Sequence, residues 1–320
     1  MYTLVLTHDI DCLSLKEFPW MHKTLWGFSY HCLKAAVSPR GIRYSLRQRA
    51  MLVWDCVSMP LIKLGLRNDP WAESFALMIA TERRLGVRST LYFLPFPNRA
   101  GVTPLGTEAP ANRSIYYDVR KEGAMIRALE RDGWEIGVHG IDAYWDDTAA
   151  RQEKQVIEEI LGHDKIGIRM HWLYSRDQAT WKLLSRTGYA YDATLGWNQA
   201  VGFPGGHYTP FRPIDGEPFM LLPLNIQDQA LFQEMKLSEE EAWVKASEVI
   251  AKANAHDAVV TLLWHNNSFV APAHWGAMYE RIIRQAQADG ARIIRAIDAV
   301  TDTVDESATA AALKHHGRRG

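Results

Sequence analysis

The chain has few cysteines and no long apolar run. Its three cysteines, Cys12, Cys32 and Cys56, show no CxxC spacing, which argues against a disulfide framework or a zinc ribbon and favours a reducing compartment. No apolar run approaches the roughly 18 residues that cross a bilayer, and the first residues lack the basic and apolar regions of a secretion signal. We therefore expect a cytoplasmic protein without a membrane span.

The charges nearly cancel, so no class of charged partner is indicated. The formal net charge is -1 at pH 7, which gives no overall attraction to nucleic acid. The chain has 320 residues, of which 47% are hydrophobic, and this is enough for one α/β barrel with insertions. We expect one domain over residues 1–306 and a flexible tail over 307–320.

Helical and strand-like patterns alternate, and a glycine that suits a left-handed cap closely follows each expected helix. The expected helices are Trp71–Leu85, Val119–Arg131, Arg151–Leu161, Gln178–Thr187 and Met278–Ala288. The expected strands are Tyr2–Leu6, Ser89–Leu94, Trp134–Val138, Ile166–Ile168, Tyr189–Tyr191, Met220–Leu222, Val259–Trp264 and Arg292–Ile294. This alternation is typical of βαβ units and predicts a single parallel (β/α) barrel. Two loops rich in Pro and Gly, 95–114 and 198–217, are expected to wall a substrate groove.

Polar clusters follow five of the expected strands. They are His8-Asp9-Ile10-Asp11, His139, Arg169-Met170-His171, Asp192 and His265-Asn266-Asn267. In a parallel barrel the carboxyl ends of all strands open on one face, so these side chains would converge there. The pattern predicts a metal site combined with acid/base groups.

Two of these clusters indicate the metal ligands. Asp9 and Asp11 alternate across Ile10, so in an extended segment both carboxylates face one side and can share a cation or divide two roles. A turn that caps a helix is the alternative. His139 lies between small residues at a strand end, and with Asp11 it would give two of the three nitrogen or oxygen ligands of a catalytic zinc. A purely structural histidine is the alternative there.

The five clusters resemble, in order, the motifs of the polysaccharide deacetylases, the NodB-homology or carbohydrate esterase family four enzymes. The matching segments are Thr7-His8-Asp9-Ile10-Asp11, Gly137-Val138-His139-Gly140, Ile168-Arg169-Met170-His171-Trp172, Tyr191-Asp192-Ala193-Thr194 and Leu263-Trp264-His265-Asn266. The resemblance spans Tyr2 to about Asp298, apart from an insertion after the first strand. It implies a distorted seven-stranded barrel and the metal-dependent removal of an N-acetyl group from an acetamido sugar.

The resemblance also implies a role for each matching residue. Asp9 would be the general base that activates water, and Asp11 and His139 would bind the metal. Arg169 would orient Asp9 and keep it ionised. Asp192 would hold His265, the general acid that protonates the leaving amine.

One position departs from the family pattern. The family has a second histidine four residues after the first, and Ala143 stands there in this chain. We expect His171 to replace it as the third ligand of one divalent ion, most simply Zn²⁺, with Asp142 as the second candidate. Alternatively, His171 packs or binds substrate and the protein is inactive. The run Arg169–Leu173 also resembles a branch of these proteins associated with bacterial surface-polysaccharide synthesis.

Substrate contacts are expected beside the same motifs. Aromatic rings can stack on sugars, and an arginine in a loop can bind a carboxylate or phosphate. Burial in the core and a surface salt bridge are the respective alternatives. The expected substrate-binding residues are Trp172, Trp197, Arg212, Trp264 and Asn266.

The segment 16–68 reads as a basic, Trp-rich helical insertion. Nine basic residues against Glu17 and Asp55 give a local charge of +7. With its interleaved aromatics, the segment could rest on an anionic membrane surface. We prefer a helical lid with buried aromatics, because so many apolar residues need burial.

Three functions fit these observations. The leading one is a metal-dependent de-N-acetylase acting on a carbohydrate. The second is a metal-dependent hydrolase of a non-sugar amide on the same fold. The third is a catalytically inactive carbohydrate-binding protein, which Ala143 would explain.

Overall fold

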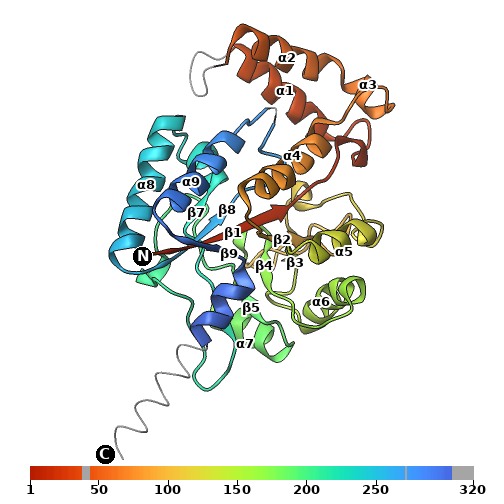
Figure 1. The fold of residues 1–320 in the computed structure, drawn as a ribbon. Coiled ribbons are helices and arrows are strands. Elements are labelled where there is room, and N and C mark those ends of the chain that lie inside the picture. Colours follow the sequence, from red (N-terminus) through yellow and green to blue (C-terminus); the bar gives the residue numbers. More distant parts are fainter. Residues whose placement is uncertain (38–43, 271, 305–320) are drawn as a thin grey trace, which may run out of the picture.

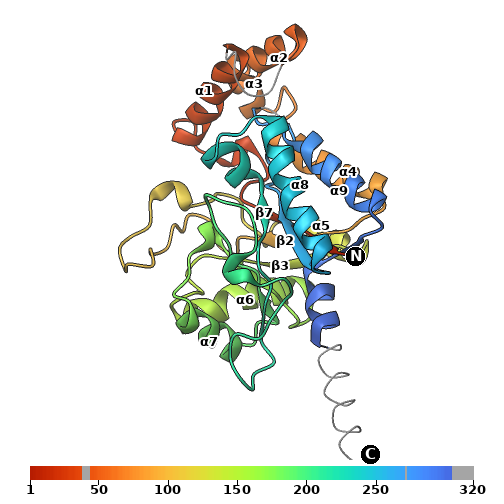
Figure 2. The ribbon, with the colours of Figure 1, turned by 90° about the vertical axis from the view of Figure 1, so that its left-hand side faces the viewer.

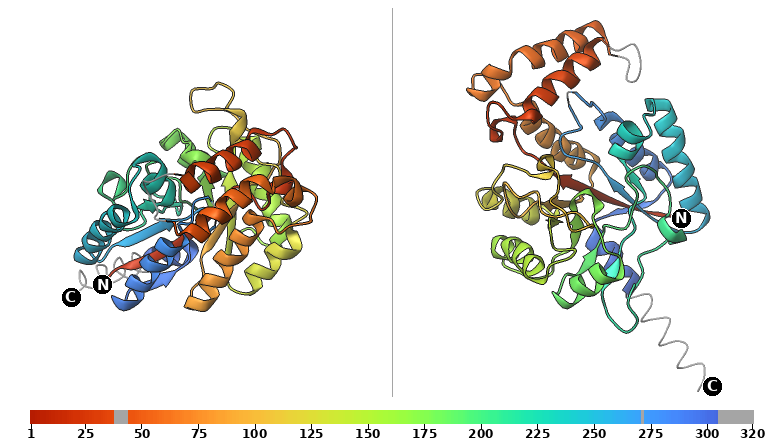
Figure 3. Two further views of the ribbon diagram at one scale, coloured as in Figure 1. Left: turned by 90° about the horizontal axis from the view of Figure 1, so that it is seen from above. Right: turned by 180° about the vertical axis from the view of Figure 1, so that it is seen from behind.

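A parallel sheet curled into an open barrel organises the molecule (Figures 1 and 3). The computed structural model describes residues 1–37, 44–270 and 272–304. Along the sheet the strands run in the order β6-β5-β4-β3-β2-β1-β8-β7, and β9 pairs with β1 outside this path. The strands are β1 (Thr3–Ile10), β2 (Thr90–Phe93), β3 (Glu135–Gly140), β4 (Ile168–Met170), β5 (Tyr191–Asp192), β6 (Met220–Leu221), β7 (Ile226–Gln227), β8 (Val259–Leu263) and β9 (Arg292–Ile294).

The predicted parallel (β/α) barrel is confirmed, and its strand count differs from the expected seven. Eight strands lie on the main path, but β6 and β7 at its two ends have only two residues each. The described strands show no pairing between β6 and β7, so the barrel is open at this seam. β9 pairs with the first residues of β1, whereas β2 pairs with the last ones.

Helices flank the sheet, and besides the helical residues 296–304 they include six elements with defined bounds. These six are α4 (Pro70–Leu85), α5 (Gly123–Arg131), α6 (Asp147–Leu161), α7 (Gln178–Arg186), α8 (Glu239–Ala255) and α9 (Gly276–Ala288). Local chemistry sets their ends. At the start of α4, Asp69 accepts from the backbone N–H of Trp71 and Ala72, and Pro70 is the first helical residue. Gly86 ends the helix with φ +70°. α8 was not predicted, although Ser238 and Glu241 form a capping box at its start.

The alternation of β1 decides which polar side chains face the barrel interior. β1 continues to Ile10, so Asp9 lies within the strand rather than after it. His8 points the other way, toward the helices, where its Nε2 lies 2.7 Å from Glu82 Oε1. Glu82 also accepts from Tyr279 and Trp134. His8 therefore belongs to a buried network that joins the sheet to its helices and not to the site.

The insertion after β1 is helical and lies beyond one end of the barrel (Figures 1 and 2). It contains η1 (Leu15–Glu17), α1 (Lys23–Val37), α2 (Leu46–Val57) and α3 (Met59–Lys63). The insertion has a small core of its own, in which Leu25, Phe28 and Cys32 of α1 meet Leu52 of α2. No helix in the described ranges is both long and apolar enough to cross a membrane. The predicted tail, 307–320, lies outside the described residues.

Candidate metal and catalytic site

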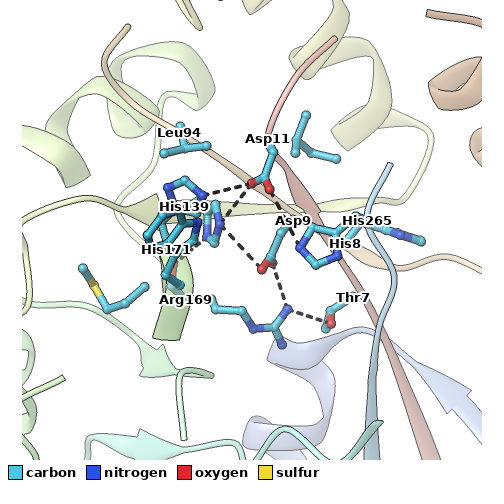
Figure 4. A network of polar contacts seen from close by, with 12 residues as sticks. Thr7, His8, Asp9, Asp11, Leu94, His139, Arg169, His171 and His265 are labelled. Atoms are coloured by element: carbon cyan, nitrogen blue, oxygen red, sulfur yellow. Dashed lines mark hydrogen bonds and ion pairs between the residues drawn. The ribbon is translucent and has the colours of Figure 1, made fainter. Parts of the chain in front are cut away.

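The ends of three strands bring Asp11, His139 and His171 together (Figure 4). Asp11 Oδ1 lies 3.4 Å from His139 Nε2 and 3.6 Å from His171 Nε2. One ligand atom from each of the three residues lies within 4.8 Å of the others. Ligands at about 2.0–2.2 Å from a tetrahedral zinc stand roughly 3.3–3.6 Å apart. The spacing therefore suits a cation held between these atoms.

The hydrogen-bonding state of the three side chains fits a cation as well. His139 Nδ1 lies 2.9 Å from the Arg169 carbonyl. A carbonyl only accepts, so Nδ1 carries a proton, and Nε2 is the ring nitrogen that can bind a cation on the side of the cluster. Asp11 Oδ1 is buried without a hydrogen-bond partner, which is costly unless a ligand satisfies it.

Charge in the cluster also favours a cation. Burial alone would raise the pKa of Asp11, but His171, His139 and His265 outweigh burial and hold the pKa well below its usual value. Burial, aided by His139 and Arg113, lowers the pKa of His171 despite the attraction of Asp11. The set is thus one carboxylate kept ionised beside imidazoles whose charge burial opposes, and such a donor set suits zinc.

A buried arginine holds the chain at His171 in place. His171 opens the short helix η3 (His171–Leu173), in which Trp172 adopts φ +62°. Arg113 Nη2 donates to the carbonyls of His171 and Ile141 at 2.9 and 3.0 Å, and so ties together the segments after β4 and β3. Arg113 was not identified from the sequence, because it lies in a loop without a motif.

The second candidate ligand, Asp142, is turned away from the cluster. Its carboxylate accepts from Arg99 Nε and from the backbone N–H of Val102, both at 2.9 Å, and so anchors the loop 95–114. Ala143 is fully buried in the core. The alternative that Asp142 replaces the missing histidine is therefore wrong for this structure.

Asp9 lies beside the cluster and is held by Arg169. Arg169 Nη1 donates to Asp9 Oδ1 at 3.0 Å and to Thr7 Oγ1 at 2.8 Å. The guanidinium lies 4.7 Å from the centre of the Tyr92 ring. The other carboxylate oxygen, Asp9 Oδ2, lies 3.6 Å from His139 Nε2 and therefore faces the cluster of Asp11, His139 and His171. Arg169 thus holds one oxygen of Asp9 and leaves the other to face the cluster.

His265 lies beside Asp11, on the side away from His139 and His171 (Figure 4), and its partner differs from the prediction. Its Nδ1 lies 2.7 Å from Asp228 Oδ1, and its backbone N–H donates to Asp228 Oδ2. Asp192 instead accepts from the backbone N–H and hydroxyl of Thr194. The prediction that Asp192 holds His265 is thus wrong.

The order of the strands explains why Asp228, and not Asp192, is the partner of His265. Asp192 ends β5, which lies on the far arm of the sheet from β8 and His265. β7 pairs directly with β8, and Asp228 is the next residue after β7. Burial raises the pKa of Asp192 to about 6, although Thr194 and Arg169 oppose that rise. Asp228 was missed because β7 is only two residues long, although a carboxylate directly after Leu224–Gln227 repeats the pattern of the other clusters.

The surroundings of His265 favour its protonated form. Burial opposes the charge, but Asp228 outweighs burial and, with Asp11 and Asp9, raises the pKa of His265 to about 10. Its Nε2 lies 3.8 Å from Asp11 Oδ2 and so faces the site. His265 can therefore carry a proton into the space beside the cluster at neutral pH.

The expected substrate-binding residues divide into two groups. Trp172 and Trp197 are partly exposed, and Asn198 donates to the Trp172 carbonyl, so both lie at the rim of the site. Trp264 is completely buried and packs on Tyr279, so it cannot stack on a sugar. Asn266 is also buried and donates to the Cys12 carbonyl, which supports the chain beside Asp11 rather than a ligand.

The described contacts do not support a substrate-binding role for Arg212. The loop 198–217 runs from the rim to the amino-terminal side of the sheet, where the Tyr208 carbonyl accepts from Val259 N, the first residue of β8. Glu217 binds Ser185 near the end of α7 on that side. Arg212 is exposed, and no described contact joins it to the site.

A cleft of about 770 Å³ opens from His265 toward the insertion. One wall is α1, and the other comprises the segment after Asp228, with its π-helix η5 (Ala230–Glu234), and the segment after His265. Aromatic side chains contribute much of the lining: Phe28, Tyr44, Trp71, Phe232 and Trp275. The cleft thus connects the candidate acid to a largely apolar channel.

Solved structures share this fold. One similar structure is a predicted polysaccharide deacetylase from Mycobacterium smegmatis, with 15% identity, a TM-score of 0.57, and coverage of 95% of this chain and 91% of that one. Another is a predicted polysaccharide deacetylase from Pseudomonas aeruginosa PAO1, with 16% identity, a TM-score of 0.54, and coverage of 94% of this chain and 90% of that one. The PuuE allantoinase is similar too, with 13% identity, a TM-score of 0.54, and coverage of 94% and 89%. No protein-family profile and no curated protein matches the chain. The chain therefore has the NodB-like fold of the polysaccharide deacetylases.

Proposed function

We propose that this protein is a metal-dependent hydrolase that removes the N-acetyl group from an acetamido sugar of a polysaccharide or its precursor. One observation carries the proposal. A three-residue cluster suited to a cation lies beside both a carboxylate held by an arginine and a histidine held by a second carboxylate. This is the minimum set for hydrolysing an amide with a metal, a base and an acid.

Asp11, His139 and His171 would hold the cation, most simply Zn²⁺. Bound there, it supplies positive charge that acidifies a water molecule and polarises an amide carbonyl. The lone pair on His139 Nε2 and the unpartnered Asp11 Oδ1 support this ligand set.

The chain's own residues divide the proton transfers. Asp9 Oδ2 takes a proton from the attacking water as the new C–O bond forms at the acetamide carbon. Arg169 keeps Asp9 in place through the bond to its other oxygen. His265 Nε2 then gives its proton to the nitrogen as the C–N bond breaks, which yields acetate and a free amine. Asp228 holds the imidazole in the orientation that points Nε2 at the site.

The shape of the cleft supports a carbohydrate rather than a small ureide as the substrate. At about 770 Å³ it can hold a ligand of several rings. Its aromatic lining, which includes Phe28, Phe232 and Trp275, offers apolar faces on which sugar rings can stack.

The decisive experiment measures product and metal together. Purified protein, loaded with Zn²⁺ and freed of excess metal, is tested for acetate release from N-acetylated oligosaccharides and for hydrolysis of allantoin. Acetate release with one bound metal per chain supports the proposal. Hydrolysis of allantoin alone would favour the non-sugar amide hydrolase. Saturable sugar binding without any turnover would identify an inactive carbohydrate-binding protein.

The ligand set is tested separately by metal analysis. We expect His171→Ala to lose the metal as fully as His139→Ala, because each removes one of three ligands. His163→Ala is the matched control, since His163 lies at the surface, where its ring bonds to Glu130. Full metal content in His171→Ala would exclude His171 as a ligand.

A further inference from the structure

Exposed apolar side chains concentrate on the insertion. Of the 20 large hydrophobic residues that are exposed in the described ranges, 14 lie between Trp20 and Leu66. Trp26, Tyr30 and Trp54 are 61%, 60% and 51% exposed. The preferred expectation of a lid with buried aromatics is therefore wrong for these residues, although Phe28 is buried as expected.

Helix α1 carries two apolar stripes, and only one of them is covered. Leu25, Phe28, Cys32 and Ala36 are buried against the core of the insertion. Trp26, Tyr30, Leu33 and Val37 recur at the same helical spacing on another face and are exposed. An amphipathic helix needs one apolar stripe to pack on its domain. The second stripe is left for a partner.

The uncovered stripe is accompanied by positive charge. In the described part of the insertion, seven Lys and Arg residues against Glu17 and Asp55 give +5. Several cations lie directly beside exposed rings: Lys34 Nζ is 6.0 Å from the centre of the Tyr30 ring, and Lys63 Nζ is 5.8 Å from that of Trp20. Arg67 lies 5.7 Å from the Trp54 ring. The surface thus combines aromatic, aliphatic and basic side chains.

We propose that the helices α1 and α2 dock this protein on the surface of an anionic phospholipid bilayer. Trp and Tyr favour the level of the lipid headgroups, Leu and Val enter the acyl boundary, and Lys and Arg pair with lipid phosphates. The helices lie on the membrane and do not cross it. This docking is independent of the activity proposed for the barrel.

Charge favours a lipid surface over a second copy of the chain. Two copies that met through this surface would each bring a local charge of +5, which opposes association. An anionic bilayer offers the opposite charge over an extended plane, and it also accepts apolar side chains without a shaped pocket. An anionic bilayer therefore accounts for both the positive charge and the exposed apolar side chains of this surface.

The proposal is tested first on the unaltered protein by co-sedimentation with vesicles. Phosphatidylcholine vesicles with and without phosphatidylglycerol are compared at low and high salt. We expect pelleting with phosphatidylglycerol at low salt, at least tenfold weaker binding to phosphatidylcholine alone, and release as salt screens the charges. Absence of pelleting with phosphatidylglycerol at low salt would overturn the proposal.

Paired variants then locate the surface. Trp26→Ser with Tyr30→Ser should weaken binding at least tenfold, and Lys23→Glu with Arg47→Glu should do so mainly at low salt. The matched control is Leu77→Ser with Val244→Ser, because these residues are 45% and 56% exposed on barrel helices. The control should bind as the unaltered protein does.

A second measurement separates docking from self-association. Sedimentation in solution without vesicles should show the same monomeric mass for the unaltered protein and for Trp26→Ser with Tyr30→Ser. A dimer that these two substitutions dissociate would assign the surface to a second copy and overturn the proposal. Equal vesicle binding by this variant and the control would do so as well.

Discussion

The mouth of the barrel and the helical insertion depart from ordinary burial in opposite directions. At the mouth, Asp9, Arg169 and Asp228 are charged residues that are almost completely buried. On the insertion, Trp26 and Tyr30 are large apolar residues that are mostly exposed. Ionisable groups are rarely buried without partners, and large apolar patches are rarely left open. Each region therefore holds an arrangement that folding alone does not favour.

The two regions differ in how their unusual residues are supported. At the mouth, partners hold each charge in a fixed place, as Thr7 and Asp9 hold Arg169. On the insertion, the exposed Tyr30 ring lies beside its helix neighbours Lys34 and His31, and no buried group holds it among the described contacts. We infer that the mouth is organised for chemistry at fixed positions and the insertion for contact with a deformable surface. Substitutions in the two regions should consequently affect different measurements.

The largest effect is expected at Asp9. Asp9→Asn should lower turnover by about 10²–10⁴ while the protein keeps its metal, because the amide preserves shape but cannot take a proton. Acetate release and metal content are measured on the same sample. Asp164→Asn, on the surface, is the control and should match the unaltered protein. If Asp9→Asn lost its metal and Asp11→Asn kept it, the roles of the two carboxylates would be reversed.

A selective loss is expected at His265. His265→Ala should remove most turnover of an acetamide, by about 10²–10⁴, because the amine leaves poorly without a proton. An aryl acetate has a good leaving group, so its hydrolysis should fall much less. Comparing the two substrates separates proton donation from simple damage to the site. Equal losses would contradict the role of general acid.

A smaller effect, on pH dependence, is expected at Asp228. A general acid acts only while protonated, so activity should fall as pH rises through the pKa of His265, which is raised to about 10. Asp228→Asn removes the main attraction that raises this pKa, and the alkaline limb of the pH profile should move toward neutral pH. Asp192→Asn should leave that limb in place. A shift of the alkaline limb in Asp192→Asn instead would show that Asp192, as first predicted, is the partner of His265.

The smallest effect is expected for exposed residues of the insertion. Trp26→Ser should change the free energy of unfolding by no more than about 0.5 kcal/mol, since the ring packs on little. Leu52→Ala, a fully buried residue in the same insertion, should cost about 2–5 kcal/mol. Urea unfolding compares the two variants. A large loss in Trp26→Ser would mean that the exposed stripe packs on the protein after all.

Sequence patterns predicted the barrel and most of the mouth because they depend on local chemistry. Gly86 and Gly162 end helices in the left-handed conformation, and a glycine after a periodic apolar segment indicates such an end. Asp9, Asp11 and His139 follow from strand ends in a parallel sheet. These residues come together because of one rule of topology, which needs no distant contact to be known.

The errors arose where distant segments decide the outcome. The partner of His265 depends on strand order, and β7 is too short to leave a pattern. Trp264 was expected at the site because it precedes His265, but alternation along β8 turns it into the core. On α1, two apolar stripes resembled the requirements of a buried helix, and nothing in the sequence told which stripe was covered.

Helix α1 lies between the core of the insertion, the cleft and the exposed stripe, and these three are separated by no more than the thickness of the helix. One face packs on the insertion core, a second lines the cleft through Thr24 and His31, and a third carries the exposed stripe. A helix with its side chains is about 10–12 Å across. A saccharide linked to a lipid by a short tether could therefore enter the cleft while its anchor stayed in the membrane. Such a substrate would be found by sliding within a plane, and its tether length would set which sugar reaches His265.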